Sequence, residues 1–291
     1  MDDDRLIDPQ GSARWQPNPA WPVPAASASS FRSVWISDLH LGTRACKADA
    51  LLNFLQRHIA ESLYLVGDIV DGWNHGRAWY WSAAQDAVVR EIANWRHHGA
   101  RVVFLPGNHD EMNLDLVEFL FGPICIHSEI VHSTAEGRRL LVTHGHQFDD
   151  SLSSLSWLAK MGGQAYTLVL RINEWSVRER LNTDRGWSAF LKRPVTKTVG
   201  YITATESDER EIVRIVRRQR ADGIVCGHTH RPAQQHIGPI LYLNDGDWVE
   251  NCTALVEDYD GALRLLRWEP GLSPGIDRQT IASEQPSETI I

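Results

Sequence analysis

Five short apolar runs in this chain each end in a polar cluster drawn from Asp, Asn, His and Gly. The runs are rich in Val, Ile and Leu, which is typical of buried strands in layered α/β proteins. Segments with a helical spacing of apolar residues separate several of the runs, and this alternation favours a layered α/β fold. The polar clusters are Asp38-Leu39-His40, Gly67-Asp68-Ile69-Val70-Asp71, Gly107-Asn108-His109-Asp110, His144-Gly145-His146 and Gly227-His228-Thr229-His230.

The same hydropathy pattern predicts the extent of each element. Glu136-Gly137 predicts a hairpin turn, and Gly99 is placed to end the helix that precedes it. We expect the last three strands to close a second sheet. The expected helices span 47–59, 83–98, 114–120 and 207–220. The expected strands span 33–37, 63–67, 101–105, 124–126, 129–133, 139–143, 223–226, 240–243, 253–257 and 262–268.

The polar clusters predict a metal site at one edge of the sheet. Ligands of open α/β sheets bind beyond the carboxyl ends of the strands, which is where the clusters fall. A single Asp-x-His pair is more often a solvated loop, but five such endings in one order are hard to explain by packing. Carboxylate, amide and imidazole ligands suit Mn, Fe or Zn, and a carboxylate can bridge two cations about 3.5–4 Å apart. The pattern therefore predicts a pair of divalent cations.

Composition narrows the class of protein and its location. A length of 291 residues is enough for one large α/β domain with an insertion. The net charge of −8 argues against a nucleic-acid-binding protein, which usually has a basic face. The four cysteines are scattered along the chain, which favours a reducing compartment. Because the chain has no apolar window of about 18 residues and no basic N-terminus, we expect a cytoplasmic location.

Three segments do not follow the alternation of strands and helices. Residues 1–30, which are rich in Pro, Ala and Ser, and residues 271–291 are expected to be disordered tails around a domain of residues 31–270. Residues 149–197 repeat apolar residues at helical spacing, which predicts a helical insertion. The part from 171 to 197 carries seven basic and three acidic side chains in an otherwise acidic chain.

The insertion and an aromatic cluster each have two interpretations. The insertion is either a pair of solvated amphipathic helices or a lid whose basic face attracts phosphate or a membrane surface. We favour the lid, with Arg171 and Arg178 as substrate contacts. The aromatic cluster that follows Asp71 either packs in the core or forms a wall beside the metals, where Trp73 would contact substrate. The other members of this cluster are Trp79, Tyr80 and Trp81.

The ordered set of polar clusters resembles the calcineurin-like metallophosphoesterases over residues 33–268. The resemblance implies a four-layer α/β/β/α sandwich of two mixed sheets flanked by helices, with the insertion as a lid. It also implies two divalent cations, most commonly Mn²⁺, with Fe or Zn as alternatives, bridged by Asp68. One cation would be held by Asp38, His40 and His230, and the other by Asn108, His144 and His228.

The resemblance also implies the chemistry. A water activated between two cations would attack phosphorus without a covalent enzyme intermediate. His109 matches the catalytic histidine of the family, which touches substrate rather than metal and would protonate the leaving group. Asp71 matches the carboxylate that orients this histidine. His146 has two interpretations, support of a metal ligand or contact with the substrate.

Within the family, the aromatic cluster, the insertion and Gly246-Asp247-Trp248 resemble the branch of UDP-2,3-diacylglucosamine diphosphatase. That enzyme releases UMP and 2,3-diacylglucosamine 1-phosphate in lipid A synthesis, uses Mn²⁺ and associates peripherally with the membrane. The resemblance therefore implies a phosphorylated glycolipid substrate and a location on the cytoplasmic face of the inner membrane. The best-known members carry Arg in place of His109 and Asp in place of His146. The alternatives are a phosphodiesterase or phosphomonoesterase with a soluble substrate, and a scaffold protein with a dead site.

Overall fold

The computed structural model of the chain divides into two compact units, Met1–His144 with Arg220–Ile291 and Gly145–Gln219. The predicted tails and the predicted lid lie outside the described residues, except that Ser29 and Ser30 already belong to the first strand. None of the described helices is long and apolar enough to cross a membrane. The structure describes residues 29–71, 79–110, 114–122, 124–148 and 206–269.

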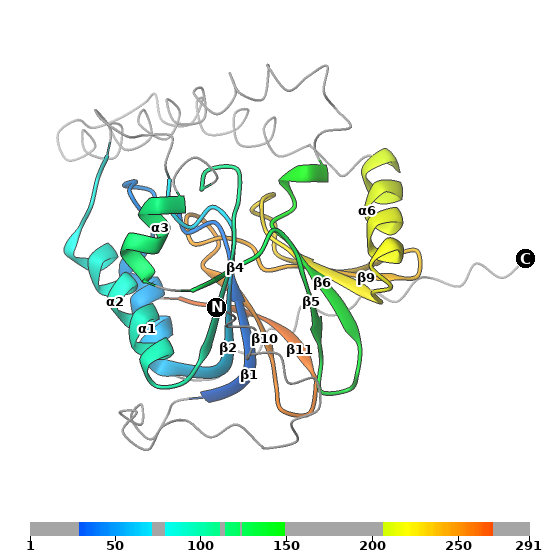
Figure 1. The fold of residues 1–291 in the computed structure, drawn as a ribbon, viewed down its shortest axis with the longest axis horizontal. Coiled ribbons are helices and arrows are strands. Elements are labelled where there is room, and N and C mark those ends of the chain that lie inside the picture. Colours follow the sequence, from blue (N-terminus) through cyan, green and yellow to red (C-terminus); the bar gives the residue numbers. More distant parts are fainter. Residues whose placement is uncertain (1–28, 72–78, 111–113, 123, 149–205, 270–291) are drawn as a thin grey trace, which may run out of the picture. The chain divides into compact units, whose positions relative to one another are not determined.

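The first unit contains two mixed β-sheets, and the larger sheet has six strands (Figure 1). Strands β1 to β4 run parallel to one another, while β10 and β11 add antiparallel pairs beside β1. β1 and β2 begin earlier than predicted, because Ser29–Phe31 pair with His58–Ala60 before the apolar runs start. In spatial order the strands are β11 (Leu263–Arg267), β10 (Thr253–Glu257), β1 (Ser29–Ile36), β2 (His58–Val66), β3 (Arg101–Leu105) and β4 (Cys125–Ile126).

The smaller sheet has five strands, of which the central three are parallel. The predicted hairpin is confirmed: β5 and β6 pair antiparallel, and Gly137 in the turn between them has a φ of 86°. In spatial order the strands are β5 (Ile130–Ser133), β6 (Arg139–Val142), β7 (Gly223–Cys226), β9 (Ile240–Asn244) and β8 (Ala233–Ile237).

Two features of the sheets differ from the sequence-based prediction. β10 and β11 were expected in the second sheet but belong to the first, where β10 pairs with β1. All five residues of β10 are buried, so its apolar pattern does not indicate which sheet it joins. β8 was not predicted, because its sequence Ala-Gln-Gln-His-Ile has no apolar run and only Ile237 is buried. It is an edge strand, where a half-exposed sequence of this kind is expected.

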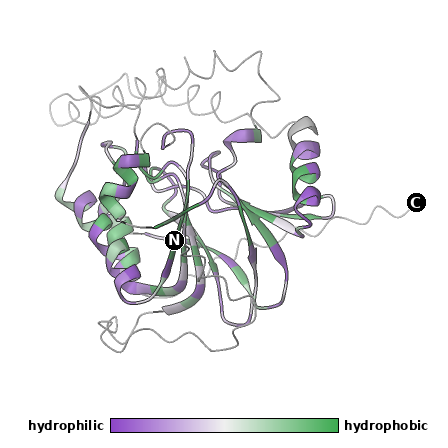
Figure 2. Cartoon of the chain, in the orientation of Figure 1, coloured by the Kyte–Doolittle hydropathy of each residue, from purple (hydrophilic) through white to green (hydrophobic). Residues whose placement is uncertain are grey.

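The predicted helices are confirmed within a few residues at each end. In the first unit they are α1 (Ala48–Arg57), α2 (Ala83–His97) and α3 (Leu114–Phe121), and the second unit contains α6 (Glu206–Arg218). Ser82 caps α2 by accepting a hydrogen bond from the backbone N–H of Gln85, at 3.2 Å. Gly99, with a φ of 101°, follows the end of α2 as predicted. α1 and α2 each carry hydrophobic and hydrophilic residues (Figure 2), and their hydrophobic residues are largely buried.

Two apolar cores hold the first unit together. One lies between the larger sheet and helices α1, α2 and α3, and includes Phe54, Trp95 and Phe104. The other is formed by residues of both sheets, such as Val66 and Leu243. The prediction of a mixed α/β protein with two mixed sheets is therefore confirmed. The loops at the carboxyl ends of the strands are fixed by these two cores.

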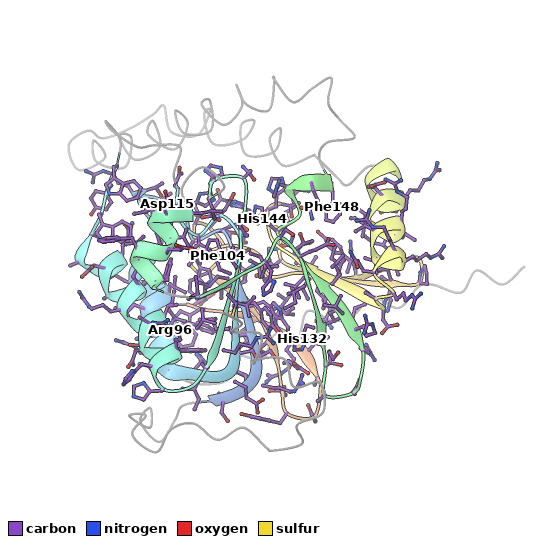
Figure 3. All side chains as sticks on the ribbon, in the orientation of Figure 1. Arg96, Phe104, Asp115, His132, His144 and Phe148 are labelled. Atoms are coloured by element: carbon purple, nitrogen blue, oxygen red, sulfur yellow. The ribbon has the colours of Figure 1, made fainter. Side chains whose placement is uncertain are left out.

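A buried polar network crosses the second core. Glu257 on β10 accepts hydrogen bonds from Arg32 at 2.8 and 2.9 Å and lies 2.8 Å from His132 Nε2. His132 Nδ1 lies 2.9 Å from the hydroxyl of Tyr64. Figure 3 labels His132, which lies on β5, and His144, which follows β6 and does not belong to this network. Because burial of Glu257 is outweighed by His132 and Arg32, the pKa of Glu257 is lowered from its usual value.

Glu257→Gln is expected to destabilise the protein by about 1.5–3 kcal/mol, the usual value of a hydrogen bond to a charged group. A lowered pKa in the folded state gives stability that is present above the unfolded-state pKa of 4.5 and lost as the pH falls through the folded-state value. The difference between wild type and variant in urea unfolding should therefore shrink below that pH. Glu136→Gln, at a half-exposed position of the hairpin turn, is the control. Equal stability of the two variants at pH 7 would contradict the prediction.

Candidate metal centre

The candidate ligands lie in loops that follow β1, β2, β3, β6 and β7. Backbone hydrogen bonds join these loops in pairs. Asp38 N donates to Gly67 O at 2.9 Å, and Gly227 N donates to His144 O at 3.1 Å. A further bond runs from His228 N to Asp38 Oδ2, at 2.9 Å, and joins the loops of the two sheets. The carboxyl ends of the strands of both sheets thus meet in one place, as the sequence predicts.

Asp38, His40 and His230 form a first cluster whose ligand-type atoms lie within 4.8 Å of one another. The distance between His230 Nε2 and Asp38 Oδ1 is 3.1 Å. His40 Nε2 is buried, has no hydrogen-bond partner among the described residues, and lies 4.0 Å from both Asp38 Oδ1 and Asp68 Oδ2. A buried nitrogen that faces two carboxylate oxygens fits a position for a cation.

Asp68, His144 and His228 form a second cluster of the same size. His144 Nδ1 lies 2.8 Å from Val66 O, so it carries the proton and Nε2 is the nitrogen that faces Asp68 Oδ1, at 3.4 Å. The predicted ligand Asn108 is held beside this cluster, because His109, which follows it in the chain, donates a backbone hydrogen bond to Asp68 Oδ1 at 2.9 Å. The structure thus brings Asp68 to the boundary between the first cluster and the second.

Asp71 lies between the rings of His40 and His109, and the three form a third cluster. Asp71 Oδ1 is 3.4 Å from His109 Nδ1, and Asp71 Oδ2 is 3.7 Å from His40 Nδ1. Burial alone would lower the pKa of His109, but Asp71 and the charge of Asp68 outweigh it and raise that pKa. From the family resemblance, Asp71 was expected to orient His109 only. The structure shows that Asp71 faces His40 as well, so it can orient both rings.

Five candidate ligands have a backbone conformation that side chains other than glycine rarely adopt. Their φ angles lie between 48° and 67°, in the left-handed region. Such a conformation costs on the order of 1–3 kcal/mol and persists where the surrounding structure imposes it. The residues are Asp38, His40, Asp68, His228 and His230. Left-handed backbone at so many of the candidate ligands marks the site independently of their chemistry.

Glycines of the motifs allow the loops to approach closely. A Cβ at Gly107 would lie 2.3 Å from Asp68 Oδ1 and 2.8 Å from His144 Nε2. A Cβ at Gly67 would lie 2.2 Å from His144 Nδ1. Both distances are far below any normal contact, so a side chain at either position would displace the groups of the second cluster.

Gly107→Ala is expected to weaken metal binding about 10–100-fold, as changes next to metal ligands typically do. It should also destabilise the protein by about 1–3 kcal/mol, the usual cost of overpacking. Metal titration and urea unfolding measure the two effects. Gly137→Ala is the control, because Gly137 also has a positive φ but a Cβ there would meet nothing within 4 Å. The prediction is wrong if both variants bind metal as wild type does.

Two buried carboxyls, Asp110 and Asp245, support the site from behind, and neither was among the predicted site residues. Asp110 accepts hydrogen bonds from the backbone N–H of Ile69, Val70 and Gly107, at 2.8–3.2 Å, and so ties the loop after β2 to the loop after β3. Burial and the charge of Asp68 raise the pKa of Asp110 to about 6. Only its place in the Gly-Asn-His-Asp motif could have indicated it.

Asp245 acts on the first cluster through Ser37. The hydroxyl of Ser37 lies 2.6 Å from Asp38 Oδ2 and 2.7 Å from Asp245 Oδ1. A hydroxyl donates only one proton, so one of these carboxyls must donate to Ser37. Burial raises the pKa of Asp245 well above its usual value, which makes Asp245 the protonated partner. Asp38 therefore receives the proton of Ser37 and presents Oδ1 to the cluster.

Residues 244–248 include Gly246-Asp247-Trp248, which contributes to the resemblance to the diphosphatase branch. In the structure Asn244, Asp245, Asp247 and Trp248 are fully buried. Asn244 Nδ2 donates to Gly227 O at 2.7 Å. The adjoining Asn251 Nδ2 donates to His230 O at 2.9 Å. These bonds hold the loop that carries both histidines after β7.

Carboxylates and imidazoles of the centre shift the pKa values of one another. Burial alone would raise the pKa of Asp38, but the charge of His230 and a hydrogen bond with it lower that pKa to about 2. Burial alone would lower the pKa of His144, but the charge of Asp68 raises it to about 10. A cation that binds an imidazole nitrogen must displace its proton, so cation binding here is favoured by higher pH.

The structure says little about the four residues that were predicted to contact the substrate. Trp73, Arg171 and Arg178 lie outside the described residues. His146 is half-buried in the turn that Phe148 N closes onto Gly145 O, at 3.0 Å, and it is not a member of the three clusters. Its role stays a prediction.

The chain matches the family model of the calcineurin-like phosphoesterases over residues 31–232. The chain belongs to this family. UDP-2,3-diacylglucosamine hydrolase from Cellvibrio japonicus (strain Ueda107) is 26% identical over 252 residues, which cover 82% of this chain and 100% of that protein. The protein of the same name from Pseudomonas aeruginosa is 27% identical over 243 residues, which cover 78% and 95%. A solved structure of an archaeal phosphodiesterase superposes with a TM-score of 0.42 at 13% identity, covering 81% and 98%.

Membership of the phosphoesterase family shows that this protein is a metal-dependent hydrolase of phosphoesters. The family implies divalent metal ions, and the three clusters supply the residues that could hold them. The scaffold alternative has no support, since the full set of candidate ligands and His109 is present. The predictions of fold, family and enzyme class are confirmed.

Proposed function

We propose that the centre holds two divalent cations and hydrolyses a phosphoester or pyrophosphate bond. Asp38, His40 and His230 would bind one cation, Asn108, His144 and His228 the other, and Asp68 both. The observation that carries this proposal is the position of Asp68, whose two oxygens face imidazoles of different clusters. Oδ1 lies 3.4 Å from His144 Nε2, and Oδ2 lies 4.0 Å from His40 Nε2. A carboxylate between two such clusters fits a bridging ligand.

The charges of the chain fit a pair of divalent cations and an anionic substrate. Asp38, Asp68 and Asp71 supply three negative charges, which two divalent cations exceed by one. The remaining positive charge attracts a phosphoryl group and leaves the buried carboxylates neutralised. The orientation of His144 by Val66 O and of His40 by Asp71 supports imidazoles in the form that binds metal.

His109 and Asp71 would act on the substrate. When bound, a pair of divalent cations supplies Lewis acidity to the phosphoryl oxygens and activates water for attack. His109 Nδ1 faces Asp71 at 3.4 Å, and Nε2 lies 3.8 Å from Asp68 Oδ2, at the edge of the proposed metal pair. From this position the imidazolium of His109 would donate a proton to the leaving oxygen and become neutral, and Asp71 would stabilise the imidazolium before the transfer.

The substrate that we favour is a sugar-nucleotide diphosphate of the UDP-2,3-diacylglucosamine type, cleaved to UMP and a diacylglucosamine 1-phosphate with Mn²⁺ as the native metal. Support comes from the relatives of that name, which the alignment covers over nearly their whole length. A phosphodiesterase or phosphomonoesterase with a soluble substrate is the second candidate. It is favoured by His109 and His146, which match the general pattern of the family.

Three further expectations belong to this proposal. The insertion 149–197 would cover the site and admit acyl chains, and Arg171, Arg178 and Trp73 would contact the substrate. The protein would act in lipid A synthesis on the cytoplasmic face of the inner membrane, in peripheral contact with it. These expectations concern residues outside the described ranges and stay predictions.

A hydrolysis screen tests the proposed function. The metal-free protein is loaded with Mn²⁺, Fe²⁺ or Zn²⁺ and offered UDP-2,3-diacylglucosamine, bis(p-nitrophenyl) phosphate and p-nitrophenyl phosphate. Preferred turnover of the glycolipid, with UMP as product, supports the first candidate. Turnover of only the two nitrophenyl esters supports the second, and inactivity of every metal-loaded form on every substrate would overturn both.

A further inference from the structure

The loop that follows His40 carries an arginine held against an aromatic ring. The guanidinium carbon of Arg44 lies 4.2 Å from the centre of the Tyr80 ring. This cation–π contact attracts the guanidinium and restricts an otherwise flexible side chain. Arg44 is exposed, and it makes no hydrogen bond or ion pair with any residue in the described ranges. Its N–H donors are therefore available to a ligand.

The loop under Arg44 is tied to the segment that carries Tyr80. Tyr80 N donates a hydrogen bond to Gly42 O at 2.8 Å. Gln85 accepts from Gly42 N at 3.3 Å and donates to Thr43 O at 2.7 Å. A Cβ at Gly42 would lie 2.5 Å from a ring carbon of Trp79, so the ring occupies the space of the missing side chain. These contacts hold the loop of residues 42–44 and the segment that carries Tyr80 together.

The members of the aromatic cluster have different roles in the structure. Trp79 and Trp81 stack on each other, with ring centroids 5.5 Å apart and an interplanar angle of 5°. Both pack against the core beneath the helices. Tyr80, between them in the chain, holds Arg44 instead. Trp79 and Trp81 thus pack as the first interpretation of the cluster expects, while a wall beside the metals stays a prediction.

The backbone of Arg44 lies close to that of the candidate ligand His40. Thr43 N donates to His40 O at 3.2 Å, which closes a turn from residue 40 to residue 43. The first and last α-carbons of such a turn are less than about 7 Å apart. The α-carbon of Arg44 is about 3.8 Å further along the chain. The backbone of Arg44 thus directly follows the turn that begins at His40, and its guanidinium lies against Tyr80.

We propose that Arg44 binds a second phosphoryl group of the substrate, the one attached to the phosphoryl group under attack. The planar guanidinium matches two phosphate oxygens at once, which an ammonium cannot do. This inference rests on the proposed function and makes Arg44 a residue that selects diphosphate substrates over simple esters. Tyr80 is a positioning residue, because it acts through Arg44.

The test compares two inhibitors of bis(p-nitrophenyl) phosphate hydrolysis by the full-length, Mn²⁺-loaded protein. Methylenediphosphonate carries two linked phosphoryl groups and inorganic phosphate carries one. Arg44→Ala is expected to raise the inhibition constant of methylenediphosphonate about 10–100-fold, which corresponds to one charge-assisted hydrogen-bond pair. The inhibition constant of phosphate and the KM of the diester should stay unchanged. Arg44→Lys should give an intermediate value.

Two further variants separate a specific role from a change of charge or fold. Arg138→Ala removes the same charge from the β5–β6 turn and should leave both inhibition constants unchanged. Tyr80→Leu should raise the constant for methylenediphosphonate less than Arg44→Ala does, and Tyr80→Phe should restore it, since the ring alone holds Arg44.

An unchanged constant for methylenediphosphonate in Arg44→Ala would overturn the inference, and so would an equal rise for both inhibitors. If the wild type hydrolyses no ester, the proposed function fails and calorimetric titration of methylenediphosphonate into the Mn²⁺-loaded proteins decides about Arg44. Tighter binding by wild type than by Arg44→Ala then supports the inference, and equal binding overturns it.

Discussion

Asp68→Ala protein is expected to lose both cations and, with them, all hydrolysis above the rate of the metal-free wild type. The reason is the position of this carboxylate, which faces His144 with one oxygen and His40 and His109 with the other. Under the proposed ligand set, loss of any other single ligand leaves one of the two cations with all four of its donors. Loss of Asp68 removes a donor from both and leaves buried imidazoles with no carboxylate between them.

Elemental analysis and activity assays at saturating Mn²⁺ measure the two losses together. Asp86→Ala removes an exposed carboxylate on α2 and is the control for net charge. Wild-type protein that is fully active with one cation, or with none, would contradict the dinuclear centre. An Asp68→Ala protein that retains one tightly bound cation would show that the clusters bind independently and that Asp68 is not a bridge.

His109→Ala is expected to keep both cations and to slow turnover about 10²–10⁴-fold, the usual contribution of general acid–base catalysis. The loss should be smaller for nitrophenyl esters, whose leaving groups need no proton. An equal loss for good and poor leaving groups would leave His109 with an electrostatic role only.

Asp71→Asn separates the two contacts of Asp71. Because Asp71 faces both His109 and the presumed ligand His40, this variant should lose some metal affinity in addition to turnover. His109→Ala should lose turnover only. Calorimetric titration with Mn²⁺ distinguishes the two, and equal metal affinity of both variants would restrict Asp71 to orienting His109.

The sequence predicts the site well because its ligands follow strand ends. Parallel strands bring their carboxyl ends to one edge, so Asp38 and Asp68 could be placed together from the strand pattern, whereas the resemblance to the family was needed to add His228 of the second sheet. The predicted ends of α2 are also close to the observed ends, since the helix begins directly after Ser82 and ends before Gly99. These features are local, and local sequence preferences determine them.

The remaining features depend on contacts between distant parts of the chain. The sequence of β10 does not indicate that it pairs with β1 and not with β9, because all five of its residues are buried and no polar face distinguishes its neighbours. The roles of Asp110 and Asp245 arise from hydrogen bonds across the fold, and their neighbours in sequence do not reveal them. Arg44 could not be singled out either, since its partner Tyr80 lies far along the chain.

The meeting of two sheets at the centre has a consequence for the mechanics of the protein. Under the proposed ligand set, each cation is bound by residues from both sheets: His40 and His230 for one, Asp68 and His144 for the other. Each cation then crosslinks the two sheets. The apolar layer between the sheets, which includes Val66 and Leu243, sets the distance between the ligands that come from one sheet and those that come from the other. Metal affinity and folding stability are therefore coupled, and a mutation that creates a cavity in that layer would lower the affinity for the metals.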